Sequence, residues 1–180
     1  TCGHSTGDDS GVNQNYSPRG FSYAYSITRG EYNALNEGGG NAIGDRELAM
    51  LRAIVIEDDR VQYYEGILEH LPESMRTFTE NGYLQDCLDR RERSCSSFTY
   101  TNTGFTAQID STQEQIIFFS VPYEPGWSAT VNGEPVAIAK VNAGFMAVVV
   151  PEGGSATIEV PYRTPGPAFG TSLIPISHPT

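Results

Sequence analysis

The second half of the chain alternates apolar and polar residues in short runs that are separated by turn residues. Residues 105–109 and 156–162 alternate in this way, so that every second side chain is apolar. Residues 116–121 form a nearly continuous apolar run, which is typical of a strand covered on both faces. Short strands at this spacing predict a compact antiparallel β-sandwich, mainly over residues 98–163.

A tight hairpin is predicted inside this region at Asn132-Gly133. Both residues tolerate the positive φ angles of a type I′ turn, and the mainly apolar runs 129–131 and 136–138 lie on either side of it. Pro135 follows directly after the turn and has no backbone N–H to donate. It therefore predicts that the returning strand lies at a sheet edge.

The first half is less regular. Thr28 and Glu31 have the spacing of a capping box, which predicts that a short helix begins there. Residues 53–56 are all apolar and predict a buried strand. From about residue 62 to residue 94 the pattern is mostly helical, with Leu84 and Leu88 on one apolar stripe opposite a charged face.

These patterns together predict an α+β protein with one domain. Residues 1–20 are rich in small polar residues and are expected to be a flexible leader. Residues 21–166 are expected to form the domain, in which short helices from residues 21–95 pack on one face or end of the sandwich. No run of about 18 apolar residues, the length needed to span a membrane, is present. Residues 167–180 are interpreted as a tail that approaches a membrane helix beyond it.

Charge and composition exclude several classes of partner. The chain has 22 acidic against 11 basic residues, which gives a net charge of −11. Such a surface repels phosphate backbones, so we expect no nucleic-acid partner. His4, His70 and His178 are scattered, and no nucleophile motif or phosphate-binding loop is present. We therefore expect no metal, no cofactor and no catalytic residue in this part of the protein.

The three cysteines, Cys2, Cys87 and Cys95, leave one thiol over if two of them pair. We expect a disulfide between Cys87 and Cys95. It requires the helix to end between them, because eight helical residues would separate the two by about 12 Å. The alternative is two half-buried thiols on a helix face. Cys2 is then either unpaired or paired outside this region.

Three arginines, Arg90, Arg91 and Arg93, follow the helical stripe. They are either a solvated helix end, where cations complement the helix dipole, or an anion site for a lipid-linked phosphate. Three aromatic residues are candidates for sugar contact, because sugar rings stack on exposed aromatic faces. These are Tyr123, Trp127 and Phe145, for which the alternative is packing against the core.

The aromatic corner belongs to a series of short motifs that keep one order along the chain. The series resembles the C-terminal extracytoplasmic part of bacterial YfhO-type membrane proteins, most clearly over residues 104–166. Its pieces are Gly104-Phe105-Thr106-Ala107, Phe118-Phe119-Ser120-Val121-Pro122-Tyr123, Gly126-Trp127, Val131-Asn132-Gly133, Gly144-Phe145-Met146, and Tyr162 with Pro165-Gly166.

The resemblance implies a polytopic membrane protein of the cell envelope that uses lipid-linked sugars. Family members have been connected with adding sugars to surface polymers such as lipoteichoic acid. The chain is then an extracytoplasmic accessory domain of a membrane glycosyltransferase, noncatalytic by itself, whose partners are the membrane-embedded part of the same polypeptide and a surface glycan or lipid-linked sugar. The alternatives are a stand-alone carbohydrate-binding β-sandwich and a structural surface domain.

Overall fold

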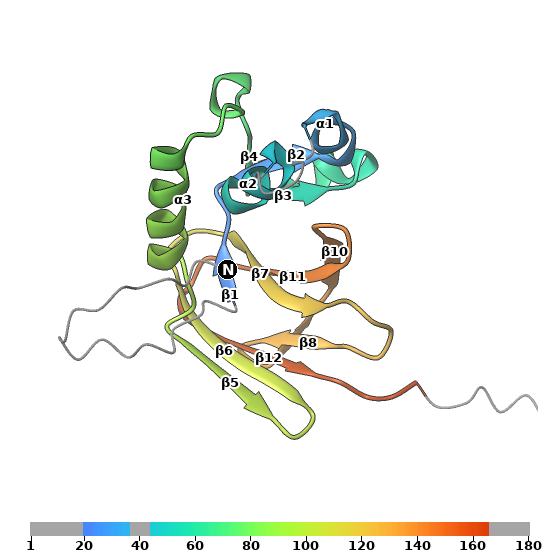
Figure 1. The fold of residues 1–180 in the computed structure, drawn as a ribbon. Helices are drawn as coiled ribbons and strands as arrows, with labels where there is room; N and C mark the ends of the chain where they lie inside the picture. The colour runs from blue at the N-terminus through green and yellow to red at the C-terminus, as the bar shows by residue number, and fades with distance from the viewer. Residues whose placement is uncertain (1–19, 37–43, 166–180) are drawn as a thin grey trace, which may run out of the picture.

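The computed structural model describes residues 20–36 and 44–165. The expected leader, apart from Gly20, and the expected tail of residues 167–180 lie outside the described residues. Within them the chain forms two antiparallel sheets, a third and smaller parallel sheet, and a few short helices (Figure 1). The prediction of an α+β protein dominated by antiparallel strands is therefore confirmed.

The first antiparallel sheet has four strands in the order β1-β7-β11-β10. Its strand β7 is covered on both faces, as its apolar run predicts. Ile117 and Phe119 are buried in one hydrophobic cluster, whereas Ile116 and Phe118 are buried in another. The strands are β1 (Gly20–Ser22), β7 (Gln115–Pro122), β10 (Ile138–Val141) and β11 (Phe145–Val150).

The second antiparallel sheet has five strands in the order β5-β6-β12-β8-β9. The predicted hairpin joins β8 to β9, with Asn132 at φ 52° and Gly133 at φ 86°. Pro135 lies in β9 at the edge of this sheet, where its missing N–H leaves no gap in the ladder. The strands are β5 (Ser97–Thr101), β6 (Gly104–Ser111), β8 (Ala129–Val131), β9 (Glu134–Val136) and β12 (Gly154–Pro161).

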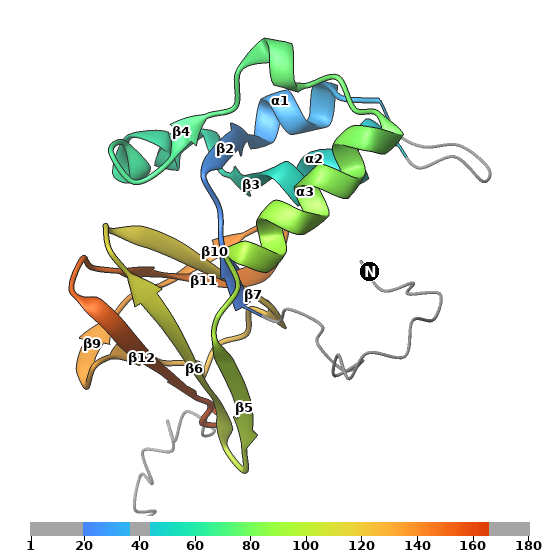
Figure 2. The same ribbon diagram turned by 90° about the vertical axis from the view of Figure 1, so that its left-hand side faces the viewer.

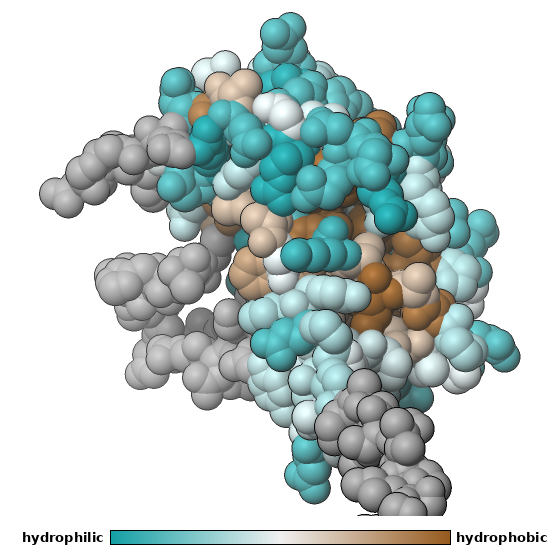
Figure 3. Space-filling model, turned by 90° about the vertical axis from the view of Figure 1, so that its right-hand side faces the viewer, coloured by the Kyte–Doolittle hydropathy of each residue, from teal (hydrophilic) through white to brown (hydrophobic). Residues whose placement is uncertain are grey.

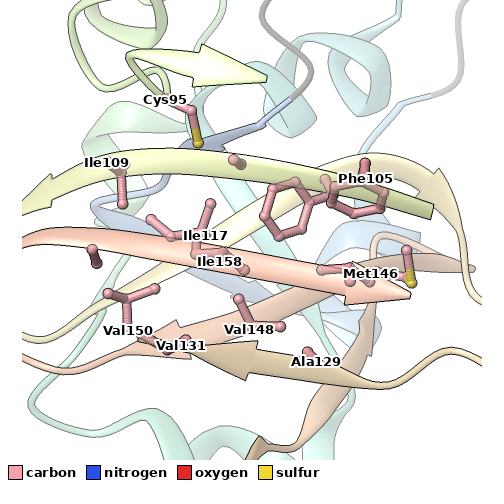
Figure 4. Close-up of a cluster of buried hydrophobic side chains, with 14 residues drawn as sticks. Cys95, Phe105, Ile109, Ile117, Ala129, Val131, Met146, Val148, Val150 and Ile158 are labelled. Carbon is pink, nitrogen blue, oxygen red and sulfur yellow. The ribbon is translucent and has the colours of Figure 1, made fainter. Parts of the chain in front are cut away.

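One hydrophobic cluster draws side chains from both antiparallel sheets (Figure 4). Phe105 and Ile158 come from the five-stranded sheet, and Phe119 and Val148 come from the four-stranded sheet. Because successive side chains of a strand point to opposite faces, every second side chain of these strands points into the interior between the two antiparallel sheets. This accounts for the regular apolar pattern of the second half of the chain.

The third sheet is parallel, has the order β3-β2-β4, and was not predicted from the sequence. With helices α1, α2 and α3 it forms what we call the upper lobe (Figure 2). The capping box is present: Glu31 N donates to Thr28 Oγ1, and Thr28 N donates to the Glu31 carboxylate. The elements are β2 (Tyr25–Thr28), α1 (Arg29–Ala34), α2 (Asp45–Arg52), β3 (Ala53–Ile56), the 3-10 helix η1 (Asp58–Tyr64), β4 (Glu69–His70), the 3-10 helix η2 (Glu73–Met75) and α3 (Glu80–Glu92).

The upper lobe packs on the outer face of the four-stranded sheet. Ile54 and Ile56 of β3 share a buried cluster with Phe118 of β7 and Ala147 of β11. Figure 3 shows apolar surface reaching the outside between the polar surface of the upper lobe and the polar surface below it. The four-stranded sheet is thus a middle layer, which explains why β7 lacks a polar face.

Helix α3 packs inward through polar side chains. Asp86 bonds Arg52 of α2, and Arg90 donates to the carbonyl of Met50. The apolar stripe that the sequence predicts is present, but Leu84 and Leu88 face outward and are exposed. Among the described residues, no helix has the length and apolar character needed to cross a membrane.

Candidate functional site

The structure separates the three aromatic candidates. Trp127 is half-buried, with its ring centroid 4.8 Å from Tyr162 and 5.9 Å from Phe105, and it packs against the cluster between the antiparallel sheets. Phe145 instead packs on Phe118, at 5.7 Å, and Phe118 belongs to the cluster beneath the upper lobe. Trp127 and Phe145 therefore do not form one platform.

Tyr123 and Phe145 are brought together at the end of the four-stranded sheet. The backbone N–H of Tyr123 donates to the carbonyl of Gly144 at 2.7 Å, which places Tyr123 beside the first residue of β11. Tyr123 is 39% exposed and Phe145 is 36% exposed. Of the predicted sugar-contacting residues, these two retain accessible ring surface at one place.

The three arginines do not converge on one point. The Arg90 guanidinium carbon lies 4.2 Å from the centroid of the Phe21 ring, and Nη2 donates to the Met50 carbonyl at 2.7 Å. Arg91 and Arg93 are exposed. Arg90 therefore packs α3 against β1 and α2, and a joint anion site of all three arginines stays a prediction.

A small open cleft lies beside Arg90 and Arg93. It is lined by three arginines and two aspartates, of which Arg52 and Asp86 bond each other at 2.8 Å. The buried Nε of Arg90 has no hydrogen-bond partner among the described residues. A water molecule or a small anion in the cleft would satisfy this donor.

The predicted disulfide between Cys87 and Cys95 is wrong. Helix α3 does end between the two residues, but Cys95 turns away into the cluster between the antiparallel sheets, where it is a buried thiol. Its backbone N–H donates to Gly20 O at 2.9 Å, which fixes this direction. Burial raises the pKa of the Cys95 thiol to about 12. Cys87, half-buried on α3, is disulfide-bonded, and Cys2 lies outside the described residues.

A cluster of three charged side chains, Glu31, His70 and Arg76, lies at the carboxyl edge of the parallel sheet. Sequence reasoning found Glu31 only as a helix cap and placed His70 in a helix, whereas His70 ends strand β4. One oxygen of Glu31, Oε1, lies 2.8 Å from Arg76 Nη2 and 3.0 Å from His70 Nε2. The other oxygen accepts hydrogen bonds from Thr28 N and Thr28 Oγ1.

The position of this cluster follows from the strand order. The chain leaves β2 to form β3 on one side, and then crosses to form β4 on the other side. Ligands of open α/β sheets bind at such a switch point, beyond the carboxyl ends of the strands. Glu31 follows β2 and His70 ends β4, so the two side chains meet at the switch point of this small sheet.

The electrostatics of the cluster keep Glu31 ionised. Partial burial alone would raise its pKa, but hydrogen bonds from Thr28, Arg76 and His70 together lower the pKa of Glu31 to about 2. A histidine beside a fixed carboxylate can hold or transfer a proton at its other ring nitrogen. Among the described residues, however, no group of three or more His, Cys, Asp or Glu side chains is arranged to hold a metal ion.

The sequence contained only a partial signal for this cluster. The Thr28–Glu31 spacing is visible, but a strand of two residues such as β4 has no periodicity. Arg76 reaches the cluster from the end of η2, and its Nε and Nη2 also donate to the Leu71 carbonyl. Only the fold brings these three segments together.

More than half of the chain matches a known protein family. Residues 74–174 match the family model described as bacterial membrane protein YfhO. No curated protein and no solved structure matches the chain. The matched range begins in η2, contains α3 and the strands from β5 onward, and leaves most of the upper lobe outside.

Proposed function

Because the chain belongs to the YfhO family of bacterial membrane proteins, we propose that it is an extracytoplasmic accessory domain of a membrane glycosyltransferase. In this role the two antiparallel sheets act as a β-sandwich that docks on the membrane-embedded part of the same polypeptide or guides an acceptor polymer. The acceptor is a cell-surface polymer of the lipoteichoic acid kind. The domain is noncatalytic by itself.

The family match is the observation that carries this proposal. It covers more than half of the chain and includes the whole region from α3 to the last strand, β12. The acidic balance of the chain, −11, repels the phosphates of a polymer of the lipoteichoic acid kind, so contact with this acceptor would run through its neutral sugars. A glycan is compatible with this charge because sugar hydroxyl groups are neutral.

Tyr123 and Phe145 are the proposed glycan contacts. Both rings keep about a third or more of their surface accessible, and the Tyr123–Gly144 hydrogen bond holds them at the same end of the four-stranded sheet. Sugar rings pack on aromatic faces of this kind through their C–H groups. Arg93, which lines the cleft beside α3, is the arginine best placed for the phosphate of a lipid-linked sugar.

Turnover of lipid-linked sugar tests the proposal. We expect the full-length membrane protein to transfer sugar, and the isolated 180-residue chain to show no transfer above background. A full-length protein with Tyr123→Ala and Phe145→Ala should transfer more slowly to a polymer acceptor, whereas Tyr63→Ala, an equally simple loss of an exposed ring on η1, should not. Robust turnover by the isolated chain would contradict the accessory role.

A stand-alone carbohydrate-binding domain is the second candidate, supported by the same exposed pair of rings. It differs in what it predicts for the isolated chain. Titration with teichoic-acid-type polymers and with neutral oligosaccharides should then show saturable binding that Tyr123→Ala weakens. Binding that needs the membrane-embedded part supports the accessory domain instead.

A further inference from the structure

Strand β5, Ser97–Thr101, is an open sheet edge with an unusual composition for this chain. It is the outermost strand of the five-stranded sheet and pairs only with β6 among the described residues (Figure 1). Residues 96–103 contain no charge and no proline, in a chain with 22 acidic and 11 basic residues. An edge of this kind offers alternate backbone N–H and C=O groups to another strand.

The other sheet edges are blocked. Strand β9 carries Pro135, β10 carries the exposed Lys140, and β4 has only two residues. Strand β1 is bridged on its free side, where Phe21 pairs with Ser94. The edge of β3 is closed by two hydrogen bonds between Val55 and Asn142. Proline, lysine and covering segments are the usual means of preventing strand addition; β5 contains no proline or lysine, and no described segment other than β6 pairs with it.

We propose that β5 is a self-association edge, at which a second copy of the chain adds its own β5 antiparallel about a two-fold axis at Thr99. The sequence Ser-Phe-Thr-Tyr-Thr reads as polar, aromatic, polar, aromatic, polar in either direction. In this register Thr99 faces Thr99 of the second copy, Phe98 faces Tyr100, and Ser97 faces Thr101. Threonine–threonine, threonine–serine and aromatic pairs are the cross-strand pairs that stabilise antiparallel sheets.

The two faces of β5 suit this register. Phe98 packs toward the interior, with its ring 4.9 Å from Phe105, and Tyr100 lies edge-on to Phe98 at 5.2 Å. Tyr100 is nevertheless 58% exposed, because β5 is the last strand on that side. A second copy would cover this ring with its own Phe98. Ser97, Thr99 and Thr101 are exposed on the opposite face, where no charge opposes the pairing.

The expected affinity is low for the isolated chain. A contact of one strand with one strand buries less than the roughly 1,200 Å² of a stable interface. Confinement of two copies to one membrane raises their effective concentration, as tethering does. Self-association through β5 therefore fits a family of membrane proteins better than it fits a freely diffusing domain.

Cysteine cross-linking tests the register directly. In the proposed dimer the two Thr99 Cα atoms lie about 4.5–5.5 Å apart, which is within the range of a disulfide. The two Ser97 residues are each displaced by two positions from the axis, so about 13 Å separates them along the strands. Under mild oxidation, Thr99→Cys should give a covalent dimer and Ser97→Cys should not, each measured against the chain without the substitution.

Charge substitutions provide a second test, by sedimentation velocity up to millimolar concentration. Thr99→Lys places two lysines opposite each other and should abolish the dimer, whereas Thr101→Lys faces the neutral Ser97 and should reduce it less. Both positions are exposed, and circular dichroism verifies that the variants fold. Equal cross-linking at Thr99 and Ser97, the absence of cross-linking at Thr99, or a chain that stays monomeric and binds only other peptides at β5 would overturn the proposal.

Discussion

Asn142 is joined to Val55 by two hydrogen bonds. Its side-chain Oδ1 accepts from Val55 N at 2.6 Å, and its backbone N–H donates to Val55 O at 3.0 Å. Val55 belongs to β3, at the edge of the parallel sheet, and Asn142 lies in the turn between β10 and β11. Asn142 thus completes the β3 edge of the parallel sheet and joins the upper lobe to the four-stranded sheet.

Replacement of Asn142 should destabilise the whole chain. Asn142→Gly keeps the left-handed backbone, at φ 46°, but leaves the buried Val55 N–H without its acceptor, which costs about 1–3 kcal/mol. Asn142→Ala should cost about 1 kcal/mol more, because an alanine at this φ is strained. Urea denaturation measures both free energies of unfolding.

Asn132 provides the matched control for that experiment. It has a similar φ of 52°, and its Oδ1 accepts from Thr157 N at 2.8 Å, but it lies on an exposed hairpin. Asn132→Gly should therefore cost less than about 1 kcal/mol, because water can replace the lost acceptor. An equal loss of stability at both positions would mean that the Asn142–Val55 hydrogen bonds do not stabilise the contact between the upper lobe and the four-stranded sheet.

The ion pair between Arg52 and Asp86 should contribute to stability chiefly through the cost of breaking it. The pair is bidentate, at 2.8 and 2.9 Å, and the two side chains are only 11% and 10% exposed. Asp86→Asn leaves the buried Arg52 charge without the carboxylate that compensates it and should cost about 3 kcal/mol or more. Thermal unfolding monitored by circular dichroism is the measurement.

The exposed pair of Arg29 and Glu57 is the comparison for Arg52 and Asp86. It has the same kind of contact, at 2.9 Å, but the Glu57 side chain is 53% exposed. Glu57→Gln should change stability by no more than about 1 kcal/mol. If the two substitutions cost the same, burial is not what gives the Arg52–Asp86 pair its importance.

The parts of this fold that the sequence predicts are those in which the pattern is local. The capping box at Thr28 and Glu31 spans only four residues, and the hairpin at Asn132 needs two residues with a particular backbone preference. The apolar run of β7 predicts its two covered faces, because a strand buried on both sides has no polar period.

The parts that the sequence does not predict depend on distant segments. Residues 53–56 are predicted correctly as the buried strand β3, but β4 and β2 are too short to show a period, so the parallel sheet and the place of His70 are not predicted. The predicted Cys87–Cys95 disulfide fails for a related reason. Spacing alone does not reveal that Cys95 is drawn into the core beside Gly20.

Cys95 should be unreactive while the chain is folded. Its thiol is buried, and burial raises its pKa from 9.0 to about 12, so almost no thiolate forms at neutral pH. Reaction with a thiol reagent at pH 8 should therefore require unfolding, and the Cys95→Ala chain gives the background. Because the unfolded thiol ionises first, folding stability should also fall as pH rises above about 9. Rapid labelling of Cys95 in the native chain would contradict the burial.

The charged cluster at the carboxyl edge of the parallel sheet should make stability depend on acid. The pKa of Glu31 is lowered from 4.5 to about 2 in the folded chain, so its stabilising effect is complete above about pH 4.5 and is lost as pH falls toward 2. After allowance for its partial exposure this amounts to about 1–2 kcal/mol. Glu31→Gln should remove that part of the acid dependence, whereas Glu152→Gln, on an exposed turn, should leave it unchanged. The free energy of unfolding measured between pH 2 and pH 7 distinguishes the two variants. An acid dependence that Glu31→Gln leaves intact would show that the contacts with Arg76 and His70 do not hold this edge of the sheet together.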